Sequence, residues 1–138
     1  MKIKFFKENV KLPAKSHLPD SGLDLFMPEA FTIKPLETKT IGLGLAVAIP
    51  EGTAGILIPR SSIAQKGLII QTSAIDPDYQ AEIHLIITNC SDKTYTFKKD
   101  SRVCSLVCVN ILNPYIEVVD SLGEPSNRGN NGLGSTGV

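Results

Sequence analysis

Short runs of β-branched, aromatic and aliphatic residues recur along most of the chain, and Pro, Gly, Asn or Asp interrupts them at short intervals. The runs are typical of strands, and the interrupting residues are typical of turns. No long segment has the periodicity of an amphipathic helix. The sequence therefore predicts an all-β subunit, a sandwich or barrel of the jelly-roll kind. The predicted strands cover residues 2–6, 30–34, 38–41, 44–49, 54–58, 67–72, 82–89, 94–98, 102–112 and 115–119.

A single helical turn is predicted, and it follows Arg60. Ser61 or Ser62 could cap this stub through its side-chain oxygen, because serine is favoured at helix N-caps. Gly67 could end the stub, because glycine is favoured just past a helix C-terminus.

The composition changes after residue 120. Of the 18 residues from 121 to 138, five are Gly, three are Asn and three are Ser. Such a segment cannot form a core of its own, and its backbone entropy is high. We therefore expect a β domain over residues 1–120 and a flexible C-terminal arm over residues 121–138. The arm is either a frayed end or a segment that wraps its N–H groups, hydroxyls and guanidinium around an anion.

Charge, hydropathy and the N-terminal residues together indicate which partners and which compartment to expect. The 14 basic and 14 acidic residues give a formal net charge of zero, so the chain lacks the positive electrostatic field that is typical of a nucleic-acid-binding protein. The longest uncharged apolar stretch, 41–50, has about half of the roughly 20 residues that a membrane-spanning helix needs. No secretory signal follows the N-terminal lysines. We expect an intracellular, cytoplasmic protein, or one of the nucleus or a virus-infected host cell, with no nucleic acid and no membrane as partner.

Three cysteines, Cys90, Cys104 and Cys108, lie in apolar, strand-like runs. An odd number of cysteines in such surroundings fits buried, reduced thiols better than a disulfide framework. This interpretation agrees with an intracellular compartment.

Arginine is scarce in this chain. Eleven residues are Lys and only Arg60, Arg102 and Arg128 are Arg, so lysine carries the general surface charge. The planar guanidinium suits bidentate contact with phosphate or carboxylate, which makes each arginine a candidate for a positional role. For any one of them alone, an ordinary ion pair is the alternative.

Two acidic segments are candidates for chemistry. Asp76 and Asp78 flank Pro77 in a predicted turn, where paired carboxylates can act as a general base or can simply cap the turn. Asp24 opens an apolar segment just after a glycine turn, which alone is a weak signal.

Taken together, five short motifs resemble those of the trimeric dUTPases, the deoxyuridine triphosphate nucleotidohydrolases. They occur in the family's order and cover nearly the whole chain. The ordered set is highly specific, and RGNNGLGSTG closes it. The matching segments are residues 21–25, 59–64, 75–79, 100–106 and 128–137.

The resemblance implies a fold and a reaction. We expect a homotrimer of jelly-roll subunits of the dUTPase-like β-clip type, with active sites at subunit boundaries and an arm that closes over a neighbour's site. The implied reaction is hydrolysis of dUTP to dUMP and pyrophosphate, which limits uracil incorporation into DNA and supplies dUMP for thymidylate synthesis. A dCTP deaminase-like enzyme and a non-enzymatic nucleotide-binding regulator on the same fold are the alternatives.

The resemblance also implies roles for single residues. Asp76 is expected to be the general base that activates the attacking water. Tyr79 is expected to lie under the deoxyribose, where its ring leaves no room for a 2′-hydroxyl. Asp24 is expected to hold the cofactor Mg²⁺ through water, since Mg²⁺ bridges phosphate oxygens and keeps several waters. Arg102 is expected to form a structural ion pair, and Asp78 to brace the hairpin.

Further residues are expected to bind the substrate. Motif two, residues 59–64, would hold the inner phosphates, and the C-terminal motif, residues 128–137, would clamp the outer phosphate. Main-chain groups of residues 70–75 and near His84 would recognise uracil. The expected substrate-binding residues are Arg60, Ser61, Ser62, Ile70, Ser73, Ala74, Ile75, Tyr79, His84, Ser105, Arg128, Leu133, Gly134, Ser135 and Thr136.

The chain departs from the family's pattern at several positions. Ala74 and Ala81 stand where the family usually has Gly, so two permissive backbone positions carry a Cβ. Ser105 replaces a phosphate-contacting Gln, and Leu133 replaces an aromatic residue that lies over the base. We expect these changes to affect rate and affinity more than the type of reaction.

Overall fold

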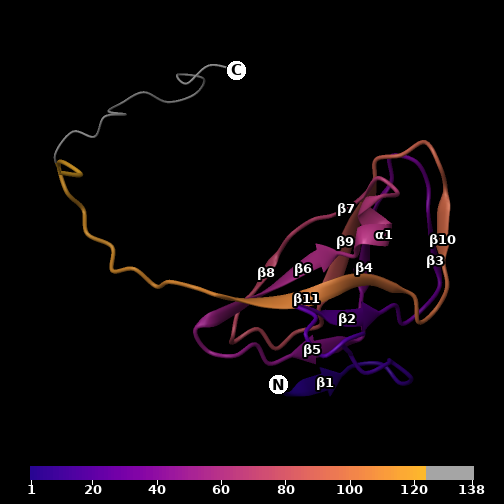
Figure 1. Ribbon diagram of the computed structural model, residues 1–138, viewed down its shortest axis with the longest axis horizontal. Coiled ribbons are helices and arrows are strands. Elements are labelled where there is room, and N and C mark those ends of the chain that lie inside the picture. Colours follow the sequence, from indigo (N-terminus) through magenta and orange to yellow (C-terminus); the bar gives the residue numbers. More distant parts are fainter. Residues whose placement is uncertain (124–138) are drawn as a thin grey trace.

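The computed structural model describes residues 1–123 of the 138. These residues are almost entirely in strands, turns and loops, which confirms the predicted all-β class. In chain order, the elements are β1 (Ile3–Phe5), β2 (Leu23–Phe26), β3 (Phe31–Ile33), β4 (Thr38–Gly42), β5 (Leu45–Val47), β6 (Thr53–Pro59), α1 (Ser61–Ala64), β7 (Leu68–Ile70), β8 (Ala74–Ile75), β9 (His84–Asn89), β10 (Tyr95–Phe97) and β11 (Arg102–Asn110) (Figure 1).

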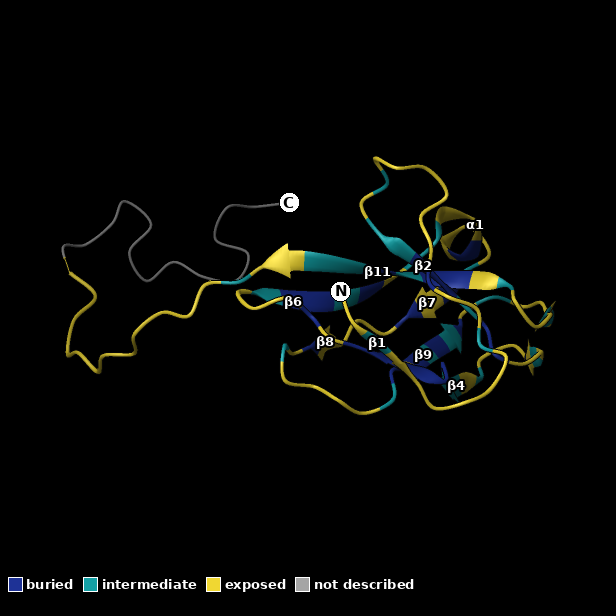
Figure 2. Ribbon diagram, turned by 90° about the horizontal axis from the view of Figure 1, so that it is seen from below, coloured by how far each residue is buried: buried dark blue, intermediate teal, exposed yellow. Residues whose placement is uncertain are grey.

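The strands form two main sheets and two smaller pairs. The larger sheet has the order β2-β11-β6-β8, and the second has the order β4-β9-β7. The pairs are β1 with β5 and β10 with β3, and every pairing is antiparallel. Figure 2 shows β2, β6 and β11 in one layer above β4, β7 and β9. The last strand in the sequence, β11, is therefore a central strand, because it lies between β2 and β6.

The core lies where these strands turn their apolar side chains toward one another. On β9, exposed His84 is followed by buried Leu85 and Ile87, as expected for a strand with one buried face. On β11, Val103, Cys104 and Leu106 are buried. These residues belong to one continuous apolar cluster that all the larger strands share.

Every predicted strand up to residue 112 overlaps an observed strand, but the strand predicted over 115–119 is wrong. The structure has no strand between residue 111 and residue 120; Ile111 N–H donates a hydrogen bond to Gly52 O at 3.0 Å, and no described strand pairs with residues 112–120. Figure 1 shows the segment leaving the body of the subunit, and Figure 2 shows it as exposed. Most of its apolar side chains are therefore not covered by the described part of the chain. Those at least 85% exposed are Leu112, Tyr115, Ile116, Val118 and Leu122.

The helical stub is present, but its predicted cap is wrong. The N-cap residue is Arg60 rather than Ser61 or Ser62, and no side chain caps the helix through a hydrogen bond. Gly67 follows with φ of 72°, a left-handed conformation that favours glycine and turns the chain into β7. No helix within residues 1–123 is long and apolar enough to cross a membrane.

All three thiols are free, but they differ in exposure. Cys104 is buried, Cys108 is half-buried and Cys90 is exposed. Burial, together with the nearby Asp24 carboxylate, raises the pKa of the Cys104 thiol to about 12. The prediction of buried thiols is thus wrong for Cys90, because this residue follows the end of β9, where the chain leaves the sheet.

Candidate functional site

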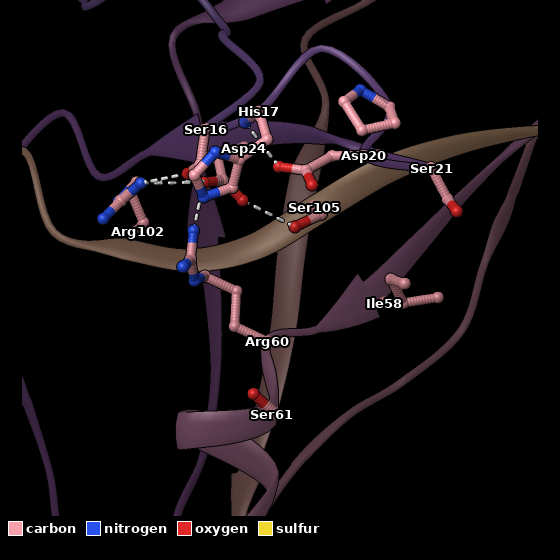
Figure 3. Close-up of a pocket in the computed structure, with 12 residues that line it drawn as sticks. Ser16, His17, Asp20, Ser21, Asp24, Ile58, Arg60, Ser61, Arg102 and Ser105 are labelled. Atoms are coloured by element: carbon pink, nitrogen blue, oxygen red, sulfur yellow. Dashed lines mark hydrogen bonds and ion pairs between the residues drawn. The ribbon is translucent and has the colours of Figure 1, made fainter.

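Three strands of the larger sheet contribute side chains to one open cavity of about 650 Å³, which is lined mostly by polar residues (Figure 3). Ser105 on β11 lies opposite Asp24 on β2 and opposite Ile58 on β6. Directly opposed residues of neighbouring strands share a face, so these three side chains point to the same side of the sheet. The cavity is lined by Ser16, His17, Pro19, Asp20, Ser21, Gly22, Asp24, Ile58, Arg60, Ser61, Arg102 and Ser105.

The Asp24 carboxylate is the centre of a hydrogen-bond network in this cavity. Its Oδ2 atom accepts hydrogen bonds from Nη1 of Arg60, from Nη1 of Arg102 at 3.1 Å and from Oγ of Ser16 at 3.2 Å. Its Oδ1 atom accepts one from Oγ of Ser105 at 2.8 Å. The side chain is only 9% exposed, so a carboxylate is held here by two guanidinium groups and two hydroxyls.

This environment keeps Asp24 ionised. Burial alone would raise its pKa, but the hydrogen bonds from Ser105, Arg60 and Ser16 and the positive charge of Arg60 outweigh burial. The pKa of Asp24 therefore lies below its ordinary value. Asp24 also fixes the position of Arg60, whose side chain is 28% exposed.

Arg102 forms the structural ion pair that the resemblance implied. Its Nη1 atom lies 3.1 Å from Oδ2 of Asp24 and donates a hydrogen bond to Oγ of Ser16 at 2.6 Å. Ser16 therefore links Arg102 to Asp24. Ser16 could not be predicted from the sequence, because it lies in a loop outside the motifs and no spacing marks it.

Motif two reaches the cavity through some of its residues only. Arg60 and Ser61 line the cavity, whereas Ser62 is exposed and is not among the lining residues. Ser105, which was expected to contact phosphate, donates its hydroxyl to Asp24. Within the subunit, Ser105 therefore contacts Asp24, the carboxylate that orients Arg60.

A second, smaller cavity of about 220 Å³ gathers residues that were expected to bind the nucleoside. Leu57 on β6 and Ile83 and Ile86 around β9 supply its apolar wall. Ile70 is not among the lining residues; it is buried and packs in the core. The expected residues that line the cavity are Ser73, Ala74, Ile75, Tyr79 and His84.

Asp76 lies on the turn that follows β8, and its side chain is exposed. Its carbonyl oxygen accepts a hydrogen bond from the main-chain N–H of Tyr79 at 3.1 Å, which closes the turn. Asp76 lines neither of the two cavities. One subunit therefore does not bring this carboxylate together with Arg60 and Ser61.

The two cavities lie on opposite sides of β6. Leu57 lines the smaller cavity and Ile58 lines the larger one. Consecutive residues of a strand point to opposite faces of the sheet. A layer of backbone thus separates the polar cavity from the apolar cavity.

Comparison with known proteins identifies the family and the fold. The dUTPase family model matches residues 8–137, nearly the whole chain. The chain belongs to the dUTPase family. This dUTPase-family chain is 37% identical over 140 residues to the deoxyuridine 5′-triphosphate nucleotidohydrolase of Clostridium tetani, with 99% of this chain and 96% of the relative covered. The human mitochondrial deoxyuridine 5′-triphosphate nucleotidohydrolase is 31% identical, and there the match covers 99% of this chain and 55% of the relative, about half its length.

Solved dUTPase structures have the same fold. The dUTPase of Staphylococcus bacteriophage 80alpha with dUpNHpp has a TM-score of 0.89 and 30% sequence identity, covering 99% of this chain and 98% of that chain. The predicted family, the jelly-roll-like fold and the class of enzyme are therefore confirmed. The predicted residues of the C-terminal motif lie outside the described part of the chain; these are Arg128, Leu133, Gly134, Ser135 and Thr136.

Proposed function

We propose that this dUTPase hydrolyses dUTP to dUMP and pyrophosphate at a site shared between the subunits of a homotrimer. The observation that carries the proposal is the separation of the two cavities by β6, with Leu57 on one side and Ile58 on the other. A single nucleotide has a polar triphosphate and an apolar base and sugar, so it needs both kinds of cavity at once. Two subunits can supply them face to face, which a single sheet cannot do.

The larger cavity is the proposed phosphate site. Arg60 uses Nη1 to bind Asp24, which leaves its other N–H donors for phosphate oxygens. Ser61 and Ser62, at the start of α1, are the proposed hydroxyl and N–H donors beside it. Ser105 acts through Asp24, since its hydroxyl bonds to that carboxylate.

Mg²⁺ is the proposed cofactor, and Asp24 fits a cation held through water. Its Oδ1 atom accepts one hydrogen bond, from Ser105, and so has a lone pair left for a water molecule. The guanidinium groups of Arg60 and Arg102 beside Oδ2 oppose direct coordination of a cation there. Within residues 1–123 no cluster of three His, Cys, Asp or Glu side chains could hold a metal, so the remaining ligands would be phosphate oxygens and water.

When bound, Mg²⁺ would neutralise charge on the phosphate oxygens. Among solved dUTPases, a mutant enzyme of phage phi11 of S. aureus has a structural Mg(II) ion.

Asp76 is the proposed general base. It removes a proton from a water molecule as the water oxygen forms a bond to the α-phosphorus, and the bond from that phosphorus to the bridging oxygen breaks to release pyrophosphate. Pro77 and the hydrogen bond from Tyr79 N–H hold the turn that carries it. Its exposed position on one subunit suits a carboxylate that faces the phosphate site of another.

The smaller cavity is the proposed nucleoside site. Tyr79, 39% exposed at its edge, would lie under the deoxyribose and exclude a 2′-hydroxyl. Main-chain groups of residues 70–75 and of His84 would read uracil, and a 5-methyl group would clash there.

The exposed C-terminal segment supports the proposed trimer. Leu112, Tyr115, Ile116 and Val118 are not covered by residues 1–123, and an apolar row of this kind is unusual unless another surface covers it. A second copy would cover it and bring residues 124–138 to a neighbour's site. Arg128, Ser135 and Thr136 would then clamp the outer phosphate, with Leu133 and Gly134 over the base. Because dUTP is made inside cells, we place the enzyme there.

Pyrophosphate release from dUTP, dCTP and dTTP, measured with and without Mg²⁺, tests the proposal. We expect turnover of dUTP alone, and light scattering should give the mass of three chains. Ammonia release from dCTP would instead indicate a deaminase. Binding of dUTP without turnover would indicate a regulator.

A further inference from the structure

The main-chain carbonyl of Glu82 connects two side chains of the nucleoside cavity. It accepts a hydrogen bond from Oη of Tyr79 at 2.9 Å and another from Nδ1 of His84 at 2.9 Å. A carbonyl oxygen has two lone pairs, and these two donors use both. Since a carbonyl only accepts, Nδ1 of His84 carries the proton. Tyr79 and His84 line the same cavity, so one carbonyl fixes two parts of its wall.

The side chain of Glu82 binds to the turn between β4 and β5, away from Tyr79 and His84. Its Oε1 atom accepts a hydrogen bond from the main-chain N–H of Gly44 at 2.7 Å. Gly44 is buried and has φ of 73°, so the turn has a conformation that favours glycine. Its N–H group would lose its partner if the carboxylate were removed, which is costly for a buried donor.

Two main-chain hydrogen bonds complete the attachment. The N–H of Leu43 donates to Ile83 O and the N–H of Ile83 donates to Leu45 O, each at 2.9 Å. A Cβ built on Gly42 would lie 2.5 Å from Oε1 of Glu82, so the absence of a side chain at Gly42 makes room for the carboxylate. The carboxylate is thus seated in a space shaped for it.

We propose that Glu82 is a positioning residue for nucleoside selection, which rests on the proposed dUTP hydrolysis. Its carboxylate holds residues 82 and 83 against the turn at Gly44, and its carbonyl holds Tyr79 and His84 in the places where they meet the sugar and the base. Glu82 itself lines neither cavity. Its loss therefore loosens substrate binding and the exclusion of ribonucleotides, while the phosphate chemistry is left in place.

The test compares Glu82→Ala, Glu82→Gln and wild type in steady-state hydrolysis of dUTP and UTP. We expect Glu82→Ala to raise KM for dUTP by roughly tenfold, with kcat changed by less than about threefold, because one buried hydrogen bond is lost. The preference for dUTP over UTP in kcat/KM should fall. Glu82→Gln keeps an acceptor oxygen and should restore both quantities to within about twofold of wild type. Glu37→Ala is the matched control, since that carboxylate contacts only Lys34 and Lys39 on the surface.

Two further variants keep the inference testable if Glu82→Ala fails to fold. Gly42→Ala should displace the carboxylate and reproduce the rise in KM without altering Glu82. Tyr79→Phe removes only the hydroxyl that bonds to Glu82 O and should lose part of the selectivity. Unchanged KM and selectivity in all these variants, beside an active wild type, would overturn the inference. A fall in kcat with unchanged KM would overturn it as well, whereas an inactive wild type would overturn the proposed function instead.

Discussion

Leu57 and Ile58 are consecutive residues of β6, yet they line different cavities. The alternation of side chains along a strand thus places the polar, arginine-containing cavity and the apolar cavity of Tyr79 on opposite faces of one sheet. In the proposed homotrimer, each chain would supply two half-sites to different neighbours. An oligomer is the simplest way to join them into whole sites.

Asp76→Asn should lower kcat by at least roughly 100-fold while binding of a non-hydrolysable dUTP analogue stays close to wild type. The amide keeps the shape of the carboxylate but cannot take the proton. A pyrophosphate-release assay measures kcat, and isothermal titration calorimetry measures the affinity for the analogue. Turnover within a few-fold of wild type would show that Asp76 is not the base.

A chain that ends at Leu122 should melt at nearly the same temperature as the full chain but lose almost all activity. It keeps every described strand and the whole apolar cluster. It loses Arg128, Ser135 and Thr136, the proposed clamp on the outer phosphate. Differential scanning calorimetry and the pyrophosphate assay test this, and an active truncated chain would contradict the proposed role of the arm.

Mixing the truncated chain with full-length Asp76→Asn, under conditions that allow subunits to exchange, should restore some activity. A mixed trimer can combine an intact Asp76 from one chain with an intact arm from another. The activity of the mixture is compared with the sum of the two separate activities. No gain over that sum would argue that each site belongs to a single chain.

Asp24→Asn should be destabilised by roughly 1–3 kcal/mol at neutral pH, because two guanidinium groups lose their carboxylate. The pKa of Asp24 is lowered by folding, so its contribution to stability is present above the ordinary value of 3.8 and is lost as the pH falls through the folded pKa. Urea unfolding at neutral pH and at several values below 3.8 measures the difference between the two proteins. That difference should shrink with acid, and a constant difference would contradict the assigned network.

The strands could be predicted where apolar and polar residues alternate, as on β9, because one buried face leaves that pattern in the sequence. β2 was not predicted, because it has only four residues and one of them is Asp24, a buried polar residue that faces the polar cavity. β8 was not predicted, because its two residues lie within a segment whose sequence is typical of a turn. The strand predicted over 115–119 failed because an apolar pattern does not say which chain will cover it.

For the site, the resemblance predicted a structural ion pair for Arg102, which the structure forms with Asp24, the carboxylate that also binds Arg60. It could not predict that Ser16 joins them, because that depends on how a loop folds over β2. The distribution of Leu57 and Ile58 between two cavities depends on strand register, which a single sequence does not encode locally.

The position of β11 has a consequence for how this protein is made. β2 and β6 do not pair with each other; each pairs with β11, which ends at Asn110. A nascent chain on the ribosome therefore exposes the unpaired edges of both strands until most of the protein has been synthesised. β6 can pair with β8 earlier, but the larger sheet, and with it the cavity around Asp24, is completed only when β11 joins β2 to β6.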